Sequence, residues 1–180
     1  MTADARPALC FRTATRADAD AIVALVHSAY RGESSRAGWT TEADLLDGQR
    51  TDAEEVSTLI VAPDSQIVLC EYGAELVASA HIQKQAESGS FGMFAVRPGR
   101  QRHGIGSALL AETERRARED WGCTSMRLSV ITLRAELTAW YERRGYRRTG
   151  IVKPFPYGQE RYGRPRRDDL RMELLQKPLR

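Results

Sequence analysis

The sequence predicts an α/β fold of the α+β type, in which a mixed sheet of about six to seven strands is flanked by about four helices. Two observations support this prediction. Runs rich in β-branched and aromatic residues alternate with segments whose apolar residues recur every three or four positions. Glycine or proline stands at most of the boundaries between them. With 180 residues the chain is within the size range of one domain, so we expect residues 1–180 to form a single domain.

Composition and charge limit the possible classes of function. Hydrophobic residues make up 42% and charged residues 28%, as in ordinary globular proteins, and no apolar run approaches the roughly 20 residues of a membrane span. Met1–Pro7 lacks the apolar stretch of an export signal, so we expect a cytoplasmic protein without membrane association. A net charge of only +3 disfavours nucleic-acid binding. Cys10, Cys70 and Cys123 lack the spacing of metal ligands, so we expect no metal.

The N-terminal half is predicted to contain one strand, three helices and a hairpin. Thr15 and Asp18 have the spacing of a capping box at the start of the first helix, and Gly32 stands where that helix would end. The predicted elements are strand Leu9–Thr13, the helix up to Gly32, short helices around Thr41–Leu46 and Ala53–Leu59, and strands Ile67–Tyr72 and Leu76–Ile82, joined at Gly73 and Ala74.

The C-terminal half is predicted to alternate strands with two helices. The longer helix follows a Pro-Gly turn and repeats apolar or small residues every four positions on its buried side, at Ile105, Leu109, Thr113, Ala117 and Trp121. The predicted elements are strand Phe91–Val96, this helix up to Gly122, strand Met126–Ile131, helix Leu133–Arg144, strands Tyr146–Lys153 and Leu170–Leu175, and a loop over Pro154–Arg167.

The segment that opens the longer helix has the features of an anion-binding site. Gly104 and Gly106 have no side chains, so a phosphate could approach the main chain closely, and a helix N-terminus adds about half a positive charge. Arg100 and Arg102 strengthen the positive field. The segment lacks the Gly-Lys-Ser/Thr ending of a P-loop, and Leu109 stands where the Rossmann fingerprint has its third glycine. Neither of these two phosphate motifs is therefore present.

Two motifs resemble those of the GNAT N-acetyltransferase superfamily. The family pattern V-x-P-x-x-(Q/R)-x-x-G-x-(G/A) is matched at every defined position by Val96–Gly106, and its aromatic-Tyr-Glu-Arg element before Gly-Phe/Tyr resembles Trp140–Tyr146. Both lie in the family's order. The resemblance implies a mixed, mostly antiparallel sheet from about Leu9 to Leu175. It also implies N-acetylation of an amine acceptor with acetyl-CoA as co-substrate.

The same resemblance assigns roles to individual residues. The main chain of Phe94, Ala95 and Val96 would pair with the pantetheine arm of acetyl-CoA, and Tyr141 would protonate the departing thiolate. The N–H groups of residues 102–107 would hold the pyrophosphate. The implied coenzyme-binding segment consists of Gln101, Arg102, His103, Gly104, Ile105, Gly106 and Ser107.

The acceptor and the group that deprotonates it stay open at this point. An amine must be neutral to attack, so a base or a desolvated pocket is needed. Glu33, Glu42 and His81 are candidate bases. Glu42 fits an early-helix carboxylate better, and a structural role suits His81 at least as well. Arg134 stands where many family members have an asparagine that contacts the coenzyme, so one polar contact is expected to differ.

Several alternatives accompany this interpretation. From its helical spacing with Leu137 and Trp140 alone, Tyr141 would be a core residue. A non-catalytic domain that senses acyl-CoA, or a transferase of a longer acyl group, would share the fold. Phe155–Tyr157 and Tyr162 could close over the acceptor or pack at the interface of a homodimer.

Overall fold

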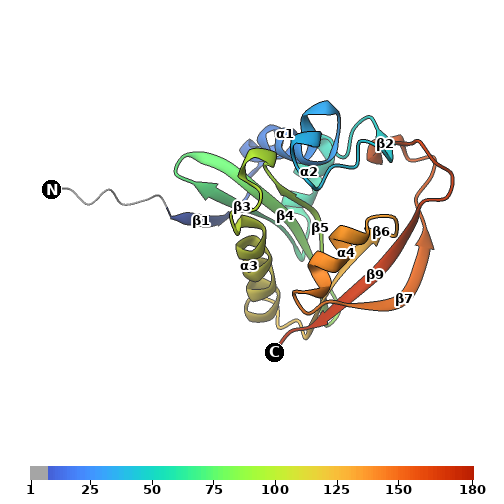
Figure 1. Cartoon of the computed structure of the whole chain (residues 1–180). Helices are drawn as coiled ribbons and strands as arrows, with labels where there is room; N and C mark the ends of the chain where they lie inside the picture. Colours follow the sequence, from blue (N-terminus) through green and yellow to red (C-terminus); the bar gives the residue numbers. More distant parts are fainter. Residues whose placement is uncertain (1–7) are drawn as a thin grey trace.

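The structure is a computed structural model that describes residues 8–180, and its centre is a sheet of seven strands (Figure 1). Met1–Pro7, in which the sequence predicts no export signal, lies outside the described residues. The strands are β1 (Leu9–Thr13), β2 (Leu46–Asp47), β3 (Ser65–Tyr72), β4 (Glu75–Gln85), β5 (Ser88–Val96), β6 (Ser125–Ile131), β7 (Arg147–Pro154), β8 (Arg164–Pro165) and β9 (Arg171–Pro178). The α-helices are α1 (Ala19–Tyr30), α2 (Ala53–Val61), α3 (Ile105–Glu119) and α4 (Ala135–Glu142).

The strand order makes the sheet mixed. In the large sheet the order is β1-β3-β4-β5-β6-β9-β7, and β2 pairs separately with β8. β5 and β6 are parallel neighbours, and the other neighbouring pairs are antiparallel. α3 makes the crossover between β5 and β6, since parallel strands cannot be joined by a tight turn. The predicted mixed, mostly antiparallel sheet with flanking helices is confirmed.

Strand β3 is covered on both faces. Ile67 and Leu69 belong to the core formed with α1 and α2, whereas Val68 and Cys70 belong to the core formed with α3 and α4. Successive side chains of a strand point to opposite faces, so a strand between two helical layers needs a continuous apolar run. Figure 1 shows α1 and α2 on one side of this part of the sheet and α3 on the other.

The buried side of α3 follows the predicted four-residue spacing for most of its length. Ile105, Leu109, Thr113 and Ala117 are buried. Trp121 comes after the last residue of the helix and is only partly buried against the core. The periodicity therefore predicts the inner face correctly and overestimates the burial at its end.

The predicted helix over Thr41–Leu46 is wrong. The segment forms turns, and Leu46 begins β2, which pairs with β8. The N–H of Ala43 donates to the hydroxyl of Thr41 at 3.2 Å, and such local bonds between side chain and backbone compete with helix formation. The segment Pro154–Arg167, which is predicted as a loop, also contains regular structure, namely β8 and a short 3-10 turn.

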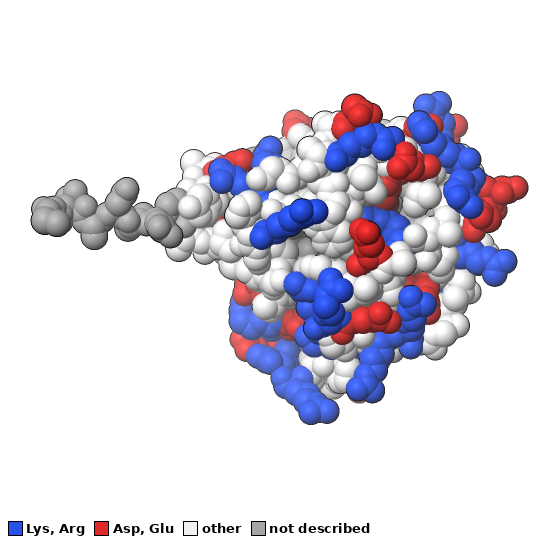
Figure 2. Space-filling view, in the orientation of Figure 1, with Lys and Arg blue, Asp and Glu red and all other residues white. Residues whose placement is uncertain are grey.

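Charged side chains of both signs are interspersed over the surface. Figure 2 shows basic and acidic groups next to one another over much of the face drawn. Many form ion pairs, such as Arg36 with Asp44 at 2.7 Å and Arg115 with Glu112 at 2.9 Å. Among residues 8–180, no helix has both the length and the apolarity needed to cross a membrane.

A substitution at Gly89 tests the packing between α3 and the parallel strands β5 and β6. A Cβ at this position would lie 2.6 Å from the sulfur of Met126 and 3.1 Å from the Cβ of Ala117. Overpacking of a core typically costs about 1–3 kcal/mol, so Gly89→Ala should lower the Tm by roughly 3 to 10 °C. Gly92→Ala in the same strand is the control, since nothing lies within 4 Å of its added Cβ. Equal melting temperatures for the two variants, measured by calorimetry, would contradict this packing.

Candidate functional site

Strands β5 and β6 are paired only where they begin. Ser88, Gly89 and Ser90 pair with Ser125–Arg127, and the ladder goes no further in the described part of the chain. The second half of β5, Phe91–Val96, therefore faces a gap in the sheet. Because main-chain polar groups at a strand edge need partners, a ligand can bind the main chain in this gap.

A β-bulge bends β5 at the same place. Across β4, Ser79 pairs with Ala95 and His81 pairs with Gly92, so β5 has one extra residue in this interval. Met93 within the bulge has a φ of +46°, a backbone region that residues other than glycine rarely adopt. Its side chain is buried in the core with α1, which holds this conformation in place. Bulges increase the local twist of a strand, which fits the divergence of β5 from β6.

The main chain of Phe94 and Val96 points into the gap. The N–H of Arg97 donates to a carbonyl oxygen of β4 at 2.8 Å, and alternate residues of a strand direct their main-chain groups to opposite sides. Consistently, the carbonyl of Phe94 accepts a hydrogen bond from the hydroxyl of Tyr30. The carbonyl of Val96 accepts one from the side-chain amide of Gln101 at 3.0 Å. The N–H groups of Phe94 and Val96 remain directed toward the gap.

A cavity of about 270 Å³, the α3 cavity, lies where β5 ends and α3 begins. Residues from the predicted coenzyme-binding set make up much of its wall: Phe94, Val96, Gln101, Arg102, Gly104, Gly106 and Ser107. Ala95, His103 and Ile105 do not line it. Ala95 and Ile105 are buried in the core. The ring of His103 lies against the carbonyl of Gln101, with its Nδ1 at 2.8 Å from the oxygen.

The loop before α3 directs main-chain N–H groups toward this cavity. Arg102 and Gly104 have φ angles of +67° and +80°, and left-handed residues within such a loop turn successive N–H groups toward one point. Within residues 8–180, the N–H groups of residues 102–107 have no main-chain acceptor. The N-terminus of α3 adds its partial positive charge. The arrangement suits a phosphate or another oxyanion.

Arg144 adds a full positive charge beside this loop. Its guanidinium carbon lies 3.6 Å from the centroid of the Trp140 ring, and its Nη2 donates to the hydroxyl of Ser107 at 2.7 Å. Among the described residues no carboxylate pairs with Arg144, so its charge is available to an anion. The sequence interpretation missed this residue, although its four-residue spacing from Trp140 within the second motif could have indicated the stacked pair.

The side chain of Gln101 fixes one wall of the α3 cavity. Its Oε1 accepts from the N–H of Trp39 at 2.9 Å, and its Nε2 donates to the hydroxyl of Thr40 at 3.0 Å. These bonds hold the segment before β2 against the end of β5. Trp39 and Thr40 line the cavity as a result. Their contribution could not be predicted, because it depends on a contact between segments about sixty residues apart.

Tyr141 is buried between aromatic rings, at 4% exposure. Its ring centroid is 5.0 Å from that of Trp140 and 5.7 Å from those of Phe91 and Tyr146. Burial raises the pKa of Tyr141 well above its ordinary value, so the hydroxyl stays protonated at neutral pH. The residue is both part of the core and part of the wall of the α3 cavity.

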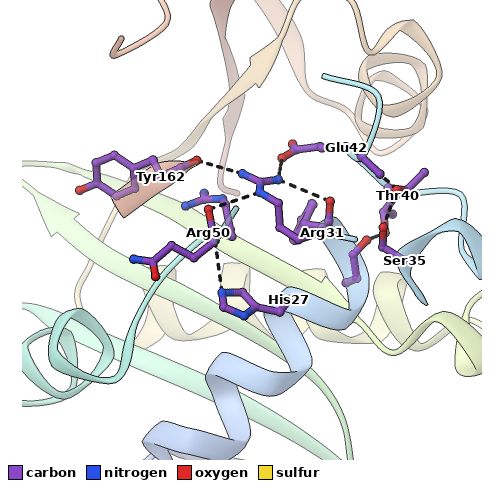
Figure 3. A network of polar contacts seen from close by, with 12 residues as sticks. His27, Arg31, Ser35, Thr40, Glu42, Arg50 and Tyr162 are labelled. Carbon is purple, nitrogen blue, oxygen red and sulfur yellow. Dashed lines mark hydrogen bonds and ion pairs between the residues drawn. The ribbon is translucent and has the colours of Figure 1, made fainter. Parts of the chain in front are cut away.

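A second cavity, the Glu42 cavity, has a volume of about 260 Å³ and contains a buried charge cluster (Figure 3). Glu42 lies between two arginines, with Arg31 on one carboxylate oxygen and Arg134 on the other at 3.0 Å. Burial disfavours the charge of Glu42, but Arg134, Arg31 and Arg50 outweigh this effect and hold its pKa below the ordinary value. Glu42 is therefore ionised at neutral pH.

The three candidate bases have separate locations. Glu42 lines the Glu42 cavity, but it is not in a helix and both of its oxygens are occupied by arginines, so the early-helix interpretation is wrong. Glu33 lies on an exposed turn and pairs with Arg36 at 2.9 Å. His81 has its Nε2 2.9 Å from the hydroxyl of Ser65, and burial lowers its pKa to about 4. Glu33 and His81 line neither cavity.

Arg134 belongs to the Glu42 cavity and not to the α3 cavity. Its Nη2 donates to the carbonyl of Thr40 at 2.7 Å, and its guanidinium carbon lies 5.9 Å from the ring centroid of Tyr30. The arginine at the usual asparagine position thus binds the protein's own main chain. Of the aromatic residues after β7 that the sequence singles out, Phe155 and Tyr162 line this cavity, whereas Tyr157 is exposed and does not.

The two cavities meet at shared wall residues. Tyr30, Phe94, Leu137 and Tyr141 line both of them. One cavity offers main-chain donors for an anion, the other contains a charge cluster, and a protonated phenol lies at their junction. Among the described residues, no group of three or more His, Cys, Asp or Glu side chains is placed to hold a metal ion.

Solved structures of acetyltransferases share this fold. The ribosomal-protein-S18-alanine N-acetyltransferase from Escherichia coli has a TM-score of 0.70 at 16% identity, with 96% of this chain and 94% of that chain covered. Nourseothricin acetyltransferase has a TM-score of 0.68 at 19% identity, covering 96% and 99%. The ribosomal-protein-alanine N-acetyltransferase from Brucella melitensis has a TM-score of 0.68 at 22% identity, covering 94% and 99%.

Two comparisons used the sequence alone. In the first, no curated protein matches the chain significantly. A sequence model of the acetyltransferase (GNAT) family matches residues 23–146, which extend from α1 to the residue before β7 and include both motifs. This chain belongs to the GNAT acetyltransferase family.

Proposed function

We propose that this chain transfers an acetyl group from acetyl-CoA to a primary amine by direct attack in a ternary complex. The observation that supports the proposal most strongly is the junction between two cavities of different character. The α3 cavity has unpaired N–H groups and arginines suited to phosphate, and it meets the Glu42 cavity at Tyr141. Such a junction allows a coenzyme and an acceptor to approach each other from two sides.

The residues of the α3 cavity fit the coenzyme group by group. The N–H groups of residues 102–107, with Arg144 beside them, would hold the pyrophosphate. The N–H of Val96 would bind an amide group of the pantetheine arm as an adjoining strand does, and the N–H of Phe94 would remain for the acetyl group. Two carbonyls of β5 already accept hydrogen bonds, from Tyr30 and Gln101, so β5 would act mainly as a donor.

Acetyl-CoA supplies a thioester, whose carbonyl carbon accepts an amine and whose sulfur leaves as a thiolate. The N–H of Phe94 is directed to the gap in which the acetyl oxygen would lie, where it would stabilise developing negative charge. The hydroxyl of Tyr141 would give its proton to the departing sulfur, and its raised pKa keeps that proton in place before transfer. The proton that the nitrogen loses as the amide forms would restore the hydroxyl, so the products are the amide and the free thiol. The aromatic rings around Tyr141 exclude water from this step.

A substitution at Gly106 tests where the coenzyme binds. Acetyl-CoA at a hundredfold excess over its Kd should stabilise the protein by about 2.7 kcal/mol, which is roughly 5 to 10 °C in Tm for this size. Gly106→Glu should abolish the shift, because its carboxylate would enter the α3 cavity. Gly99→Glu carries the same charge in the preceding turn, outside the cavity, and should keep most of the shift. A full shift in Gly106→Glu would contradict binding at this site.

Tyr141→Phe tests the proton donor. The variant keeps the ring packing and loses the hydroxyl, so kcat should fall by about 10²- to 10⁴-fold while stabilisation by acetyl-CoA persists. Tyr146→Phe is the control: its hydroxyl donates to Glu114 at 2.8 Å outside both cavities, so it should lower Tm and leave kcat nearly unchanged. The raised pKa also predicts that activity is not lost through ionisation of Tyr141 up to about pH 10. Full activity of Tyr141→Phe would contradict this role.

A further inference from the structure

The Glu42 cavity contains an unbalanced set of charges. Three arginines, Arg31, Arg50 and Arg134, line it together with one glutamate. Glu42 is ionised, so it compensates only one of them. An excess of two positive charges therefore faces the interior of a cavity that lies against the proposed reaction centre.

Two of these arginines already bind Glu42 and main-chain carbonyls of the protein. Arg31 pairs with Glu42 and also donates to the carbonyl of Tyr162 at 3.0 Å and to that of Gln49 at 3.4 Å. Arg134 pairs with Glu42 and donates to a main-chain carbonyl. Their role is to hold the carboxylate and the segments around it.

Arg50 differs from both. It lies just after β2 and is half-buried, and its main-chain N–H is fixed by the ring of His27 at 3.2 Å. Within residues 8–180, its guanidinium has neither an ion-pair partner nor a side-chain hydrogen bond. Figure 3 shows Arg50 next to the network that Arg31 and Glu42 form. The backbone is anchored, and all the guanidinium donors are free to bind a ligand in the cavity.

The rest of the wall is largely apolar. Three parts of the chain form this surface, namely β6, β9 and the segment that follows β7. The residues are Leu128, Val130, Ile131, Phe155 and Met172. An acceptor that fills the cavity would therefore combine a group that neutralises Arg50 with an apolar part of modest size. Arg31, Arg50 and Arg134 line the Glu42 cavity and not the α3 cavity, whereas Tyr141 lies at the junction of the two. The anionic group and the reacting amine would therefore occupy different parts of the acceptor's site.

We propose that the acceptor is a small molecule of the amino-acid type, a primary amine that also carries an anionic oxyacid group, and that Arg50 binds this group. The inference rests on the proposed acetyl transfer and names its substrate class. A guanidinium matches a carboxylate or a phosphonate with two parallel hydrogen bonds. Polyamines and lysine side chains bring only positive charge and would be repelled by the excess of arginines.

The same charges help to prepare the amine for attack. Nearby positive charges disfavour an ammonium group and lower its pKa. An acceptor with an anion bound at Arg50 can tolerate this repulsion, because the anion supplies the binding energy. No separate base with a raised pKa is then required in the cavity, in keeping with the full engagement of Glu42 by arginines.

Matched pairs of acceptors test the proposal. We would measure kcat/KM by thiol release for apolar amino acids such as leucine, methionine and phenylalanine, for their carboxamides, for an aminophosphonate analogue and for spermidine. The acids should exceed their carboxamides at least tenfold. The phosphonate arm shows whether the site requires a carboxylate or accepts oxyanions in general, and the carboxamides also stand for a peptide N-terminus.

Three variants then assign the preference to a residue. Arg50→Met should lower kcat/KM for the acids at least tenfold, mainly through KM, and leave the carboxamides nearly unchanged, whereas Arg50→Lys should retain part of the preference. Arg147→Met is the control, since Arg147 lies on the exposed strand β7 away from the Glu42 cavity. Stabilisation by acetyl-CoA should be the same in all of these proteins.

The outcomes separate this inference from the proposed function. Suppose that acetyl-CoA stabilises the protein. The anionic acceptor is then contradicted if carboxamides or spermidine are acetylated at the same rate as the acids, or if none of the acids is acetylated. The same conclusion follows if Arg50→Met retains the preference for acids. In these cases the proposed transferase function would stand. If acetyl-CoA gives no stabilisation, both the function and its acceptor class are overturned.

Discussion

The divergence of β5 from β6 is the feature on which the rest of the site depends. The two strands are paired only at their first residues, and beyond them β5 carries a bulge at Met93. The gap directs the N–H groups of Phe94 and Val96 toward a ligand instead of a neighbouring strand. It also makes room for the two cavities that meet at Tyr141. Gly89 keeps α3 close to the point where the strands are still paired.

The buried charge cluster organises the side of this gap that the proposed acceptor would occupy. Arg31 follows α1, Glu42 precedes β2 and Arg134 precedes α4, so one carboxylate links three parts of the chain. A buried ion pair adds little net stability, but removing one partner typically costs about 3–5 kcal/mol because a charge is left uncompensated. The cluster therefore specifies how these segments are arranged. Arg50, next to it, is left for a ligand.

The parts of the site that were predicted from sequence depend on local patterns. The glycine spacing of the loop before α3 and the four-residue repeat of α3 are properties of a few consecutive residues. The remaining parts depend on contacts between distant segments. Glu42 and Arg134 are 92 residues apart, and β2 is a two-residue strand, too short for any periodicity to indicate. Arg134 was recognised as a departure from the family pattern, but its contact with Thr40 follows only from the fold.

Amide hydrogen exchange, measured with and without acetyl-CoA, tests the central claim most directly. In the free protein the N–H groups of residues 102–107 have no main-chain acceptor, so they should exchange rapidly. Bound acetyl-CoA should slow exchange in this loop and at Phe94 and Val96, and leave the exposed edge strand β7 unchanged. Protection confined to other segments, or none under saturating acetyl-CoA, would contradict a coenzyme site built on the divergence of β5 and β6.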